Sequence, residues 1–276
     1  MKISEIQAKD KKPFRAYFNR VPIWWKYHER TQAIFDYANE RYYQLPTNKL
    51  TYDDYIRGVV KEGLFDKLDL HYIFSGDGDI NFRLINIINP GTYNGTAFGG
   101  LEWSNEGVKG NGINGYINTN FNPALLVEGQ KFQPIDASFG GVIYRQPSTG
   151  NVLRNLMSTG LNTNFIIASN TVQNRINSIT NLEATLVFAG TGMTLLSREN
   201  NLTILCIKKD QLQERDQPVW NMSSNNFTVL RLSETQFSDQ TVSTIAIGAS
   251  LTYEEVQLER QFFNEYLTAI GLEPIA

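Results

Sequence analysis

The sequence has a single cysteine and only two histidines among its 276 residues, and this scarcity argues against several kinds of chemistry. One cysteine cannot form a disulfide within the chain. Cys206 lies in the apolar run LTILCIKK, where a thiol usually behaves as a small buried hydrophobic group. His28 stands in a charged aromatic stretch and His71 in a β-rich run, and no serine is marked as a nucleophile beside either. We therefore expect neither a Ser-His-Asp triad nor a zinc centre.

The chain also lacks an excess of charge and a long apolar run. Its formal net charge is −3 and its pI is near 5.5, so no overall field attracts phosphate backbones, and we expect no nucleic-acid partner. No apolar run reaches the length of a membrane span, and the first residues, MKISEIQAKDKKPFRAYF, lack the apolar centre of a secretory signal. We expect a soluble protein synthesised in the cytoplasm.

Glycine and asparagine are concentrated in the stretch GVKGNGINGYINTNFNP, residues 107–123. It does not match the Gly-x-x-x-x-Gly-Lys-Ser/Thr pattern of a phosphate-binding loop, and a strand pattern rather than a helix follows it. We interpret the glycines as turn residues. The segment GYINTNF then alternates as a strand that directs Ile117 and Phe121 towards a core.

Short β-rich runs separated by Gly, Asn, Ser and Asp continue through most of the chain. Many short strands at this spacing predict a sandwich or a barrel. Besides GYINTNF, the predicted strands are LHYIF, ASFGGVIYR, NFIIAS, EATLVFAG, LTILCIKK, FTVLRL and TVSTIAIGASL.

Three segments are predicted to be helical. The sequence TYDD, which begins at Thr51, combines a capping hydroxyl with an acidic first turn and predicts a helix over 52–65. A capping box of Thr252 and Glu255 predicts a closing helix over 253–270. Residues 24–43 contain neither glycine nor proline, so we expect a helical arm within 1–47 and a separate β domain over 48–276.

The arm is unusually rich in aromatic residues. Trp24, Trp25, Tyr27 and Phe35 do not fall on one side of a helix, and they would expose a large apolar surface if nothing covered them. We expect the arm to dock onto a particle or onto sister subunits, in a homo-oligomer such as a trimer. The alternative is intrachain docking onto the sandwich. Under the assembly hypothesis, removal of residues 1–46 would leave a folded monomer.

Four segments together resemble a known family. EGLFDKLDLHYIF, RLINIINP, GVKGNGINGYINTNFNPA and TIAIGASLTYEEVQLERQFFNEYLTAIG are similar to segments of the concanavalin A-like (laminin-G-like) jelly-roll domains of bacteriophage and prophage virion proteins. The resemblance covers roughly residues 51–123 and 195–271. The segment LLSRENNLTILCIKKDQL is similar to a hairpin of that family, although Lys-Lys-Asp replaces its usual Asn-Gly turn. Residues 124–194 match only as alternating strands.

The resemblance implies a mainly β, concanavalin A-like jelly-roll sandwich with a helical arm and short flanking helices. It implies a structural protein of a virion, such as a tail, spike or fibre component, that contacts other virion proteins and binds a host-surface glycan. Two alternatives use the same scaffold. One is a purely architectural capsid, neck or decoration protein, and the other is a carbohydrate-active enzyme.

Jelly rolls recognise glycans through loops that combine an aromatic ring with polar side chains, since a sugar has an apolar face and a rim of hydroxyls. Three loops are candidates, although ordinary exposed turns have the same composition. They are SGDGDIN with Asp77, Asp79 and Asn81, IYRQPSTGN with Tyr144 and Arg145, and DQPVWNMSSNN with Trp220 and Asn221.

The first of these loops also has the alternate acid spacing of a calcium site, but Ile88 stands where the bidentate acid is expected. We expect no other metal and no cofactor.

Jelly-roll glycosidases need two facing carboxylates, and their usual Glu-x-Asp-x-x-Glu pattern is absent. Glu102 and Glu106 flank Trp103, but we interpret them as an exposed hairpin end. We expect no hydrolase activity.

Overall fold

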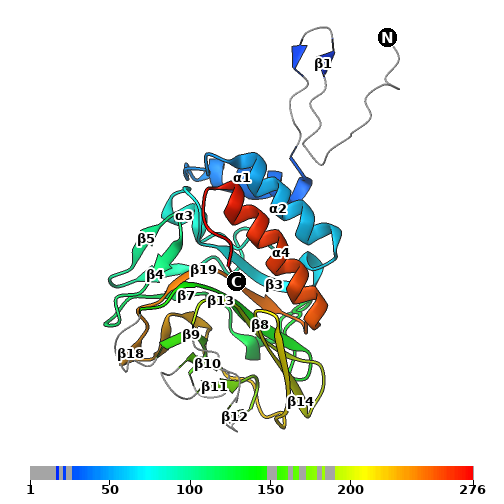
Figure 1. The fold of residues 1–276 in the computed structure, drawn as a ribbon, viewed down its shortest axis with the longest axis vertical. Coiled ribbons are helices and arrows are strands. Elements are labelled where there is room, and N and C mark those ends of the chain that lie inside the picture. Colours follow the sequence, from blue (N-terminus) through cyan, green and yellow to red (C-terminus); the bar gives the residue numbers. More distant parts are fainter. Residues whose placement is uncertain are drawn as a thin grey trace.

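The computed structural model describes residues 17–18, 21–22, 27–147, 154–160, 164–167, 172–178, 182–183 and 190–275, and its ribbon is drawn in Figure 1. Four α-helices occur in this part of the chain, together with 3-10 turns at Phe65–Lys67 and Pro123–Leu125. The helices are α1 (Glu29–Glu40), α2 (Lys49–Lys61), α3 (Ile80–Arg83) and α4 (Tyr253–Ala269). None of these helices has the length and apolar composition that a bilayer crossing needs.

The first large sheet has eight strands, and every strand pair in it is antiparallel. Strand β19 is central, because it pairs with β8 on one side and with both β3 and β6 on the other. In order, the strands are β15 (Gln211–Asp216), β14 (Thr203–Lys208), β13 (Gly192–Arg198), β8 (Ala137–Arg145), β19 (Thr241–Gly248), β6 (Gly107–Lys109) and β5 (Glu102–Ser104), with β3 (Leu68–Ile73) beside β19.

The second large sheet has seven antiparallel strands. In order, they are β12 (Leu182–Glu183), β11 (Val172–Arg175), β10 (Asn164–Ile167), β9 (Arg154–Ser158), β16 (Thr228–Val229), β7 (Tyr116–Asn118) and β4 (Thr96–Phe98). Two small ladders complete the description. They pair β1 (Tyr17–Phe18) with β2 (Val21–Pro22) and β17 (Arg231–Ser233) with β18 (Gln236–Phe237).

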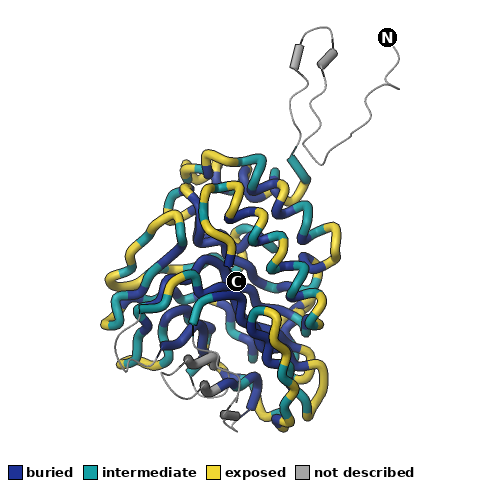
Figure 2. The backbone as a smooth tube through the Cα atoms, in the orientation of Figure 1, coloured by how far each residue is buried: buried dark blue, intermediate teal, exposed yellow. Residues whose placement is uncertain are grey.

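The eight-stranded sheet lies between the second sheet and a layer of helices (Figure 1). Its strands alternate between two hydrophobic cores. Phe139 of β8 and Tyr72 of β3 pack between the sheets, whereas Val142 and Ile73 on the same strands pack against α1, α2 and α4. Burial on both faces produces the band of buried backbone through the middle of Figure 2. The structure is a mainly β antiparallel sandwich with short helices, as the sequence predicts.

The predicted closing helix is confirmed, since α4 spans Tyr253–Ala269 and begins with the capping box of Thr252 and Glu255. The helix predicted over 52–65 begins earlier. It starts at Lys49, its N-cap is Asn48 rather than Thr51, and no side chain caps it. Tyr52, in the first turn, is buried in the helix-side core, so packing rather than a capping hydroxyl holds this end of the helix.

The helix within the predicted arm is short and belongs to the packed body. It covers only Glu29–Glu40, and β1 and β2 form a strand ladder before it. Phe35 is buried in the core that α2 and α4 share. The Tyr27 ring packs edge-on against the Phe35 ring, with 5.1 Å between the ring centroids. For these two aromatics the structure matches the intrachain alternative. The other two predicted assembly residues, Trp24 and Trp25, lie outside the described residues.

Buried polar groups join the helix layer to the eight-stranded sheet. His71 Nε2 on β3 lies 2.9 Å from Thr244 Oγ1 and 3.2 Å from the Tyr55 hydroxyl. Glu259 Oε1 of α4 lies 3.8 Å from the same nitrogen. Burial lowers the pKa of His71 to about 3 and raises the pKa of Glu259 to about 7. The imidazole is therefore neutral near pH 7, and the carboxyl retains part of its proton.

The docking of α1 predicts a stability effect that is independent of assembly. Phe35→Ala should lower the free energy of unfolding of the isolated chain by about 3–5 kcal/mol, because it opens a cavity under α1. Tyr42→Ala is the control, since that ring is 96% exposed, and should change stability by less than about 0.5 kcal/mol. Urea unfolding measures both. Unchanged stability in Phe35→Ala, accompanied by loss of an oligomer, would restore the assembly hypothesis for this residue.

The Glu259 carboxyl predicts a pH effect of defined sign. Its folded-state pKa is above the ordinary value of 4.5, so the folded chain keeps a proton that the unfolded chain releases. The stabilisation from this group is complete below that ordinary value and is lost as the pH rises through about 7. Glu259→Gln should therefore gain stability relative to the wild type as the pH is raised across this range.

Urea unfolding at an acidic and an alkaline pH tests the effect, and Glu265→Gln is the matched control because Glu265 is exposed on the same helix. The unfolding free energy of the Glu265→Gln variant should change between the two pH values as that of the wild type does. A stability difference between Glu259→Gln and the wild type that does not change with pH would contradict the assignment.

Candidate functional site

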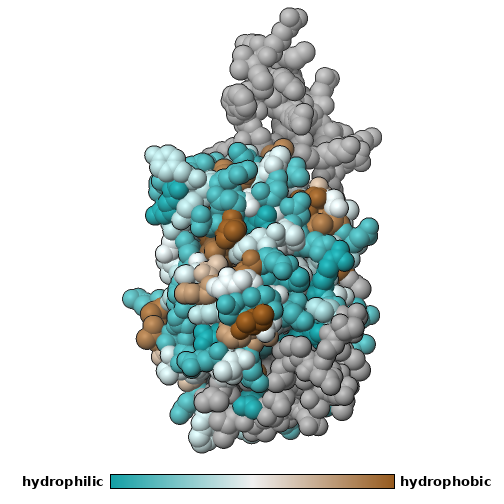
Figure 3. All heavy atoms as spheres, turned by 90° about the vertical axis from the view of Figure 1, so that its left-hand side faces the viewer, coloured by the Kyte–Doolittle hydropathy of each residue, from teal (hydrophilic) through white to brown (hydrophobic). Residues whose placement is uncertain are grey.

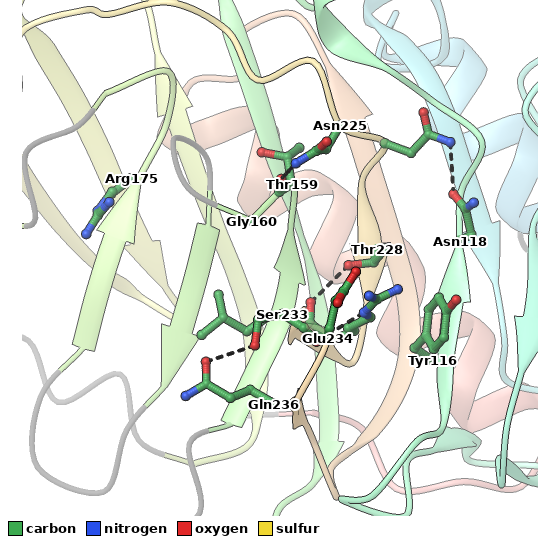
Figure 4. A pocket seen from close by; sticks show the side chains of 13 residues that line it. Tyr116, Asn118, Thr159, Gly160, Arg175, Asn225, Thr228, Ser233, Glu234 and Gln236 are labelled. Atoms are coloured by element: carbon green, nitrogen blue, oxygen red, sulfur yellow. Dashed lines mark hydrogen bonds between the residues drawn. The ribbon is translucent and has the colours of Figure 1, made fainter.

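A groove of about 660 Å³ lies on the outer face of the seven-stranded sheet (Figure 4). Its floor comes from β7, β16 and the end of β9, and one wall comes from the β17–β18 hairpin. The lining residues are Tyr116, Asn118, Thr159, Gly160, Arg175, Asn225, Asn226, Thr228, Arg231, Leu232, Ser233, Glu234 and Gln236.

Strand alternation places the floor residues on this face. Ile117 of β7 and Val229 of β16 are paired across the two strands, and both are fully buried in the core between the sheets. Their neighbours Tyr116, Asn118 and Thr228 must then point the other way, because successive side chains of a strand alternate between faces. The pattern that fills the core also builds the groove.

An aromatic row borders the groove. Phe98 of β4 is the cross-strand partner of Tyr116, and the two rings stack with centroids 4.9 Å apart and an interplanar angle of 10°. The guanidinium of Arg231 lies over the Tyr116 ring, 4.6 Å from its centroid, and 5.9 Å from the centroid of Phe237. Packing of a cation against two rings restricts the position of the Arg231 side chain.

Amide side chains fill the end of the groove near β7. Asn226 Nδ2 donates to Asn118 Oδ1 at 3.2 Å, and Asn225 Nδ2 donates to the Thr159 carbonyl at 3.1 Å. Thr228 Oγ1 lies 3.1 Å from the Ser158 carbonyl. These hydrogen bonds fix one end of each amide and leave other donor and acceptor atoms of the groups to face the groove (Figure 4).

Among the lining residues that the structure describes, the charged ones are two arginines and one carboxylate. Arg231 belongs to the hairpin wall, and Arg175 lies across the groove at the end of β11 (Figure 4). Burial lowers the pKa of Arg175. Glu234 is exposed in the turn between β17 and β18. The described lining therefore carries more positive than negative charge, in a chain whose net charge is −3.

The predicted loop SGDGDIN uses its carboxylates to hold backbone. Asp77 Oδ1 accepts a hydrogen bond from the Thr47 amide at 2.9 Å. Asp79 is the N-cap of α3, where Oδ1 accepts from the Phe82 amide at 2.8 Å. Asn81 is exposed within α3. Within the described ranges, no group of three or more His, Cys, Asp or Glu side chains is placed to hold a metal ion.

The second predicted loop begins at the C-terminal end of β8, an interior strand of the eight-stranded sheet. The Tyr144 hydroxyl donates to the Glu273 carbonyl at 3.2 Å, so its ring packs on the helix side. Arg145 forms a two-pronged ion pair with Glu106. This pair lies beside a smaller cleft of about 390 Å³.

Glu102 and Glu106, the pair that we did not expect to act as glycosidase carboxylates, line the same cleft together with Trp103. Glu102 accepts from Lys109 Nζ at 2.9 Å, and Glu106 is engaged by Arg145. Both carboxylates are therefore in ion pairs at a sheet edge.

The third predicted loop lies apart from the other two, and its last residues, Asn225 and Asn226, reach the groove. The Trp220 side chain is 54% exposed, and its backbone amide donates to the Asn177 carbonyl at 2.6 Å. Asn221, beside it, is exposed. The three loops are not brought together, and none of the seven side chains singled out in them as ligand contacts lines the groove. Strand alternation in GYINTNF contained the missed signal, because an inward Ile117 requires an outward Tyr116 and Asn118.

No family model matches the sequence, and no curated protein matches it. Solved structures do. The sialidase of Trypanosoma rangeli matches with a TM-score of 0.50 at 11% identity, over 81% of this chain and 39% of the sialidase. The same enzyme in complex with 2-keto-3-deoxy-D-glycero-D-galacto-2,3-difluoro-nononic acid gives a TM-score of 0.51 at 12% identity, over 81% and 40% of the two chains.

The binding domain of botulinum neurotoxin serotype D also matches, with a TM-score of 0.47 at 9% identity, over 70% of this chain and 51% of the neurotoxin domain. This chain thus spans about half or less of the length of these structures. At such identities the likeness to the sialidase establishes the β-sandwich fold and nothing about activity.

Proposed function

We propose that this protein is a lectin-like β-sandwich that binds a glycan in the groove over β7 and β16. The observation that carries the proposal is the lining itself, in which amide and hydroxyl side chains surround the apolar surface of Tyr116 and Leu232. A sugar offers many hydroxyl groups, each a donor and an acceptor, around small patches of C–H surface. A groove of this composition provides partners for both.

The surrounding surface supports a polar ligand. On the side of the molecule that carries β4, β5 and β18, the described surface is mainly hydrophilic, and its apolar patches are small and separate (Figure 3). A site for a stable protein partner usually presents a larger continuous apolar patch. The groove is also open and preformed, which suits an extended carbohydrate chain.

The lining favours binding over hydrolysis. The usual glycosidase mechanism requires two carboxyl groups on either side of the scissile bond. Among the described lining residues Glu234 is the one carboxylate, and it is exposed in a turn. We therefore propose that bound glycan is held without being cleaved.

Substitutions in the groove test the proposal. Asn118→Ala should weaken binding on a glycan array roughly 5- to 150-fold, because loss of one partner of a desolvated polar contact costs about 1–3 kcal/mol. Tyr116→Ala should weaken it by a similar factor, because the apolar ring surface that packs on the sugar is lost. Trp220→Ala is the control, since it removes an exposed aromatic ring outside the groove. Thermal unfolding verifies that each variant is folded.

If the Trp220 variant loses binding while both groove variants retain it, the predicted loop rather than the groove is the site. Chromatography of the glycan after incubation tests cleavage, and appearance of shorter products would contradict the non-hydrolytic part of the proposal.

We further propose that this binding serves host attachment by a virion. Support comes from the sequence segments that resemble phage jelly-roll domains. Immunogold electron microscopy of purified virions should place the chain on a tail, spike or fibre, and light scattering should detect an oligomer such as a trimer. Labelling of a capsid or neck by a chain without glycan affinity would instead support the architectural alternative.

A further inference from the structure

We infer that the groove selects glycans that carry carboxylate groups, and that Arg231 is the residue that recognises the carboxylate. The inference rests on the proposed glycan-binding function and adds the chemical class of the ligand. It depends on how Arg231 is held, on which partners it has, and on the other charges of the groove.

Arg231 is fixed but only partly hydrogen-bonded. Its guanidinium lies over Tyr116, near Phe237, and its Nε donates to the Ser233 carbonyl at 3.1 Å. Within the described residues, neither terminal Nη nitrogen has a protein acceptor, and no carboxylate forms an ion pair with the group. Glu234 lines the same groove without pairing with it.

Two other arginines of the sheets are neutralised by carboxylates. Arg145 pairs with Glu106, and Arg154 pairs with Asp239 through an Nε–Oδ1 distance of 2.9 Å. Arg231 differs from both because its planar fork faces a groove instead of a protein carboxylate. A guanidinium fork matches the two oxygens of a carboxylate, and the contact is stronger than a neutral hydrogen bond.

The balance of charge in the groove favours an anion. Arg175 provides a second positive charge across the floor, and burial already disfavours the charged form of this group. A bound carboxylate would stabilise it. Glu234 opposes the same anion from the hairpin turn, so the groove contains one group whose removal should strengthen binding.

Matched polysaccharides test the inference. Polygalacturonate, hyaluronate and colominic acid are each immobilised beside a form in which the carboxyl groups have been reduced to alcohols, and neutral glycans complete the set. The wild-type chain should bind at least one acidic polymer about tenfold or more tightly than its reduced form, since a charge-assisted contact is lost on reduction.

Variants assign the preference to its residue. Arg231→Gln should weaken binding of the acidic polymer about tenfold and leave binding of the reduced polymer unchanged. Glu234→Gln should strengthen binding of the acidic polymer alone. Arg41→Gln is the matched control, because Arg41 also lies over a tyrosine ring, at 3.6 Å from the centroid of Tyr37, but it is the C-cap of α1, away from the groove.

Equal binding of acidic and reduced polymers would overturn the inference and leave glycan binding in place. An equal loss for both polymers in Arg231→Gln would also overturn it, since the side chain would then only support Tyr116. Binding restricted to neutral glycans contradicts the carboxylate class. If no glycan in the set binds, the proposed function fails as well.

Discussion

The structure depends on an eight-stranded sheet that is buried on both faces. Each of its central strands must supply apolar side chains in both directions, one set for the core between the sheets and one for the core under the helices. Within β8, the pair Gly140 and Gly141 has no side chain, and a Cβ at either position would lie 2.3 Å or less from a carbonyl oxygen of a neighbouring strand. The central strands β8 and β19 of the sheet therefore have no free face on which to bind a ligand.

Burial of this sheet explains where the groove of the proposed glycan site lies. The helices cover one face, and the seven-stranded sheet covers the other, so the exposed face of the second sheet is left for recognition. On that face, β7 and β16 present polar side chains while their alternate residues anchor the core. Fold stability and the proposed binding thus depend on opposite faces of the same strands, so residues of the groove can change without disturbing the core.

Within the groove, most polar groups are held by neighbours, whereas two features remain available to a ligand. The amides near Asn118 retain donor and acceptor atoms, and Arg231 retains the outer edge of its guanidinium. Held groups lose little conformational freedom on binding, which favours affinity. Outside the groove, two acidic side chains that the sequence analysis considered stabilise the fold. Asp79 caps α3, and Glu106 forms an ion pair with Arg145.

The sequence by itself determined the fold class and several elements. Its β-rich run ASFGGVIYR predicted β8 over residues 137–145 as observed, and the capping box predicted the start of α4, because these signals are local. Docking of α1 depended on tertiary structure, since Phe35 could pack on its own chain or on another. The groove did too. Tyr116, Arg175 and Arg231 lie far apart in sequence and meet only because the strand order places β16 between β7 and β9, which no local pattern encodes.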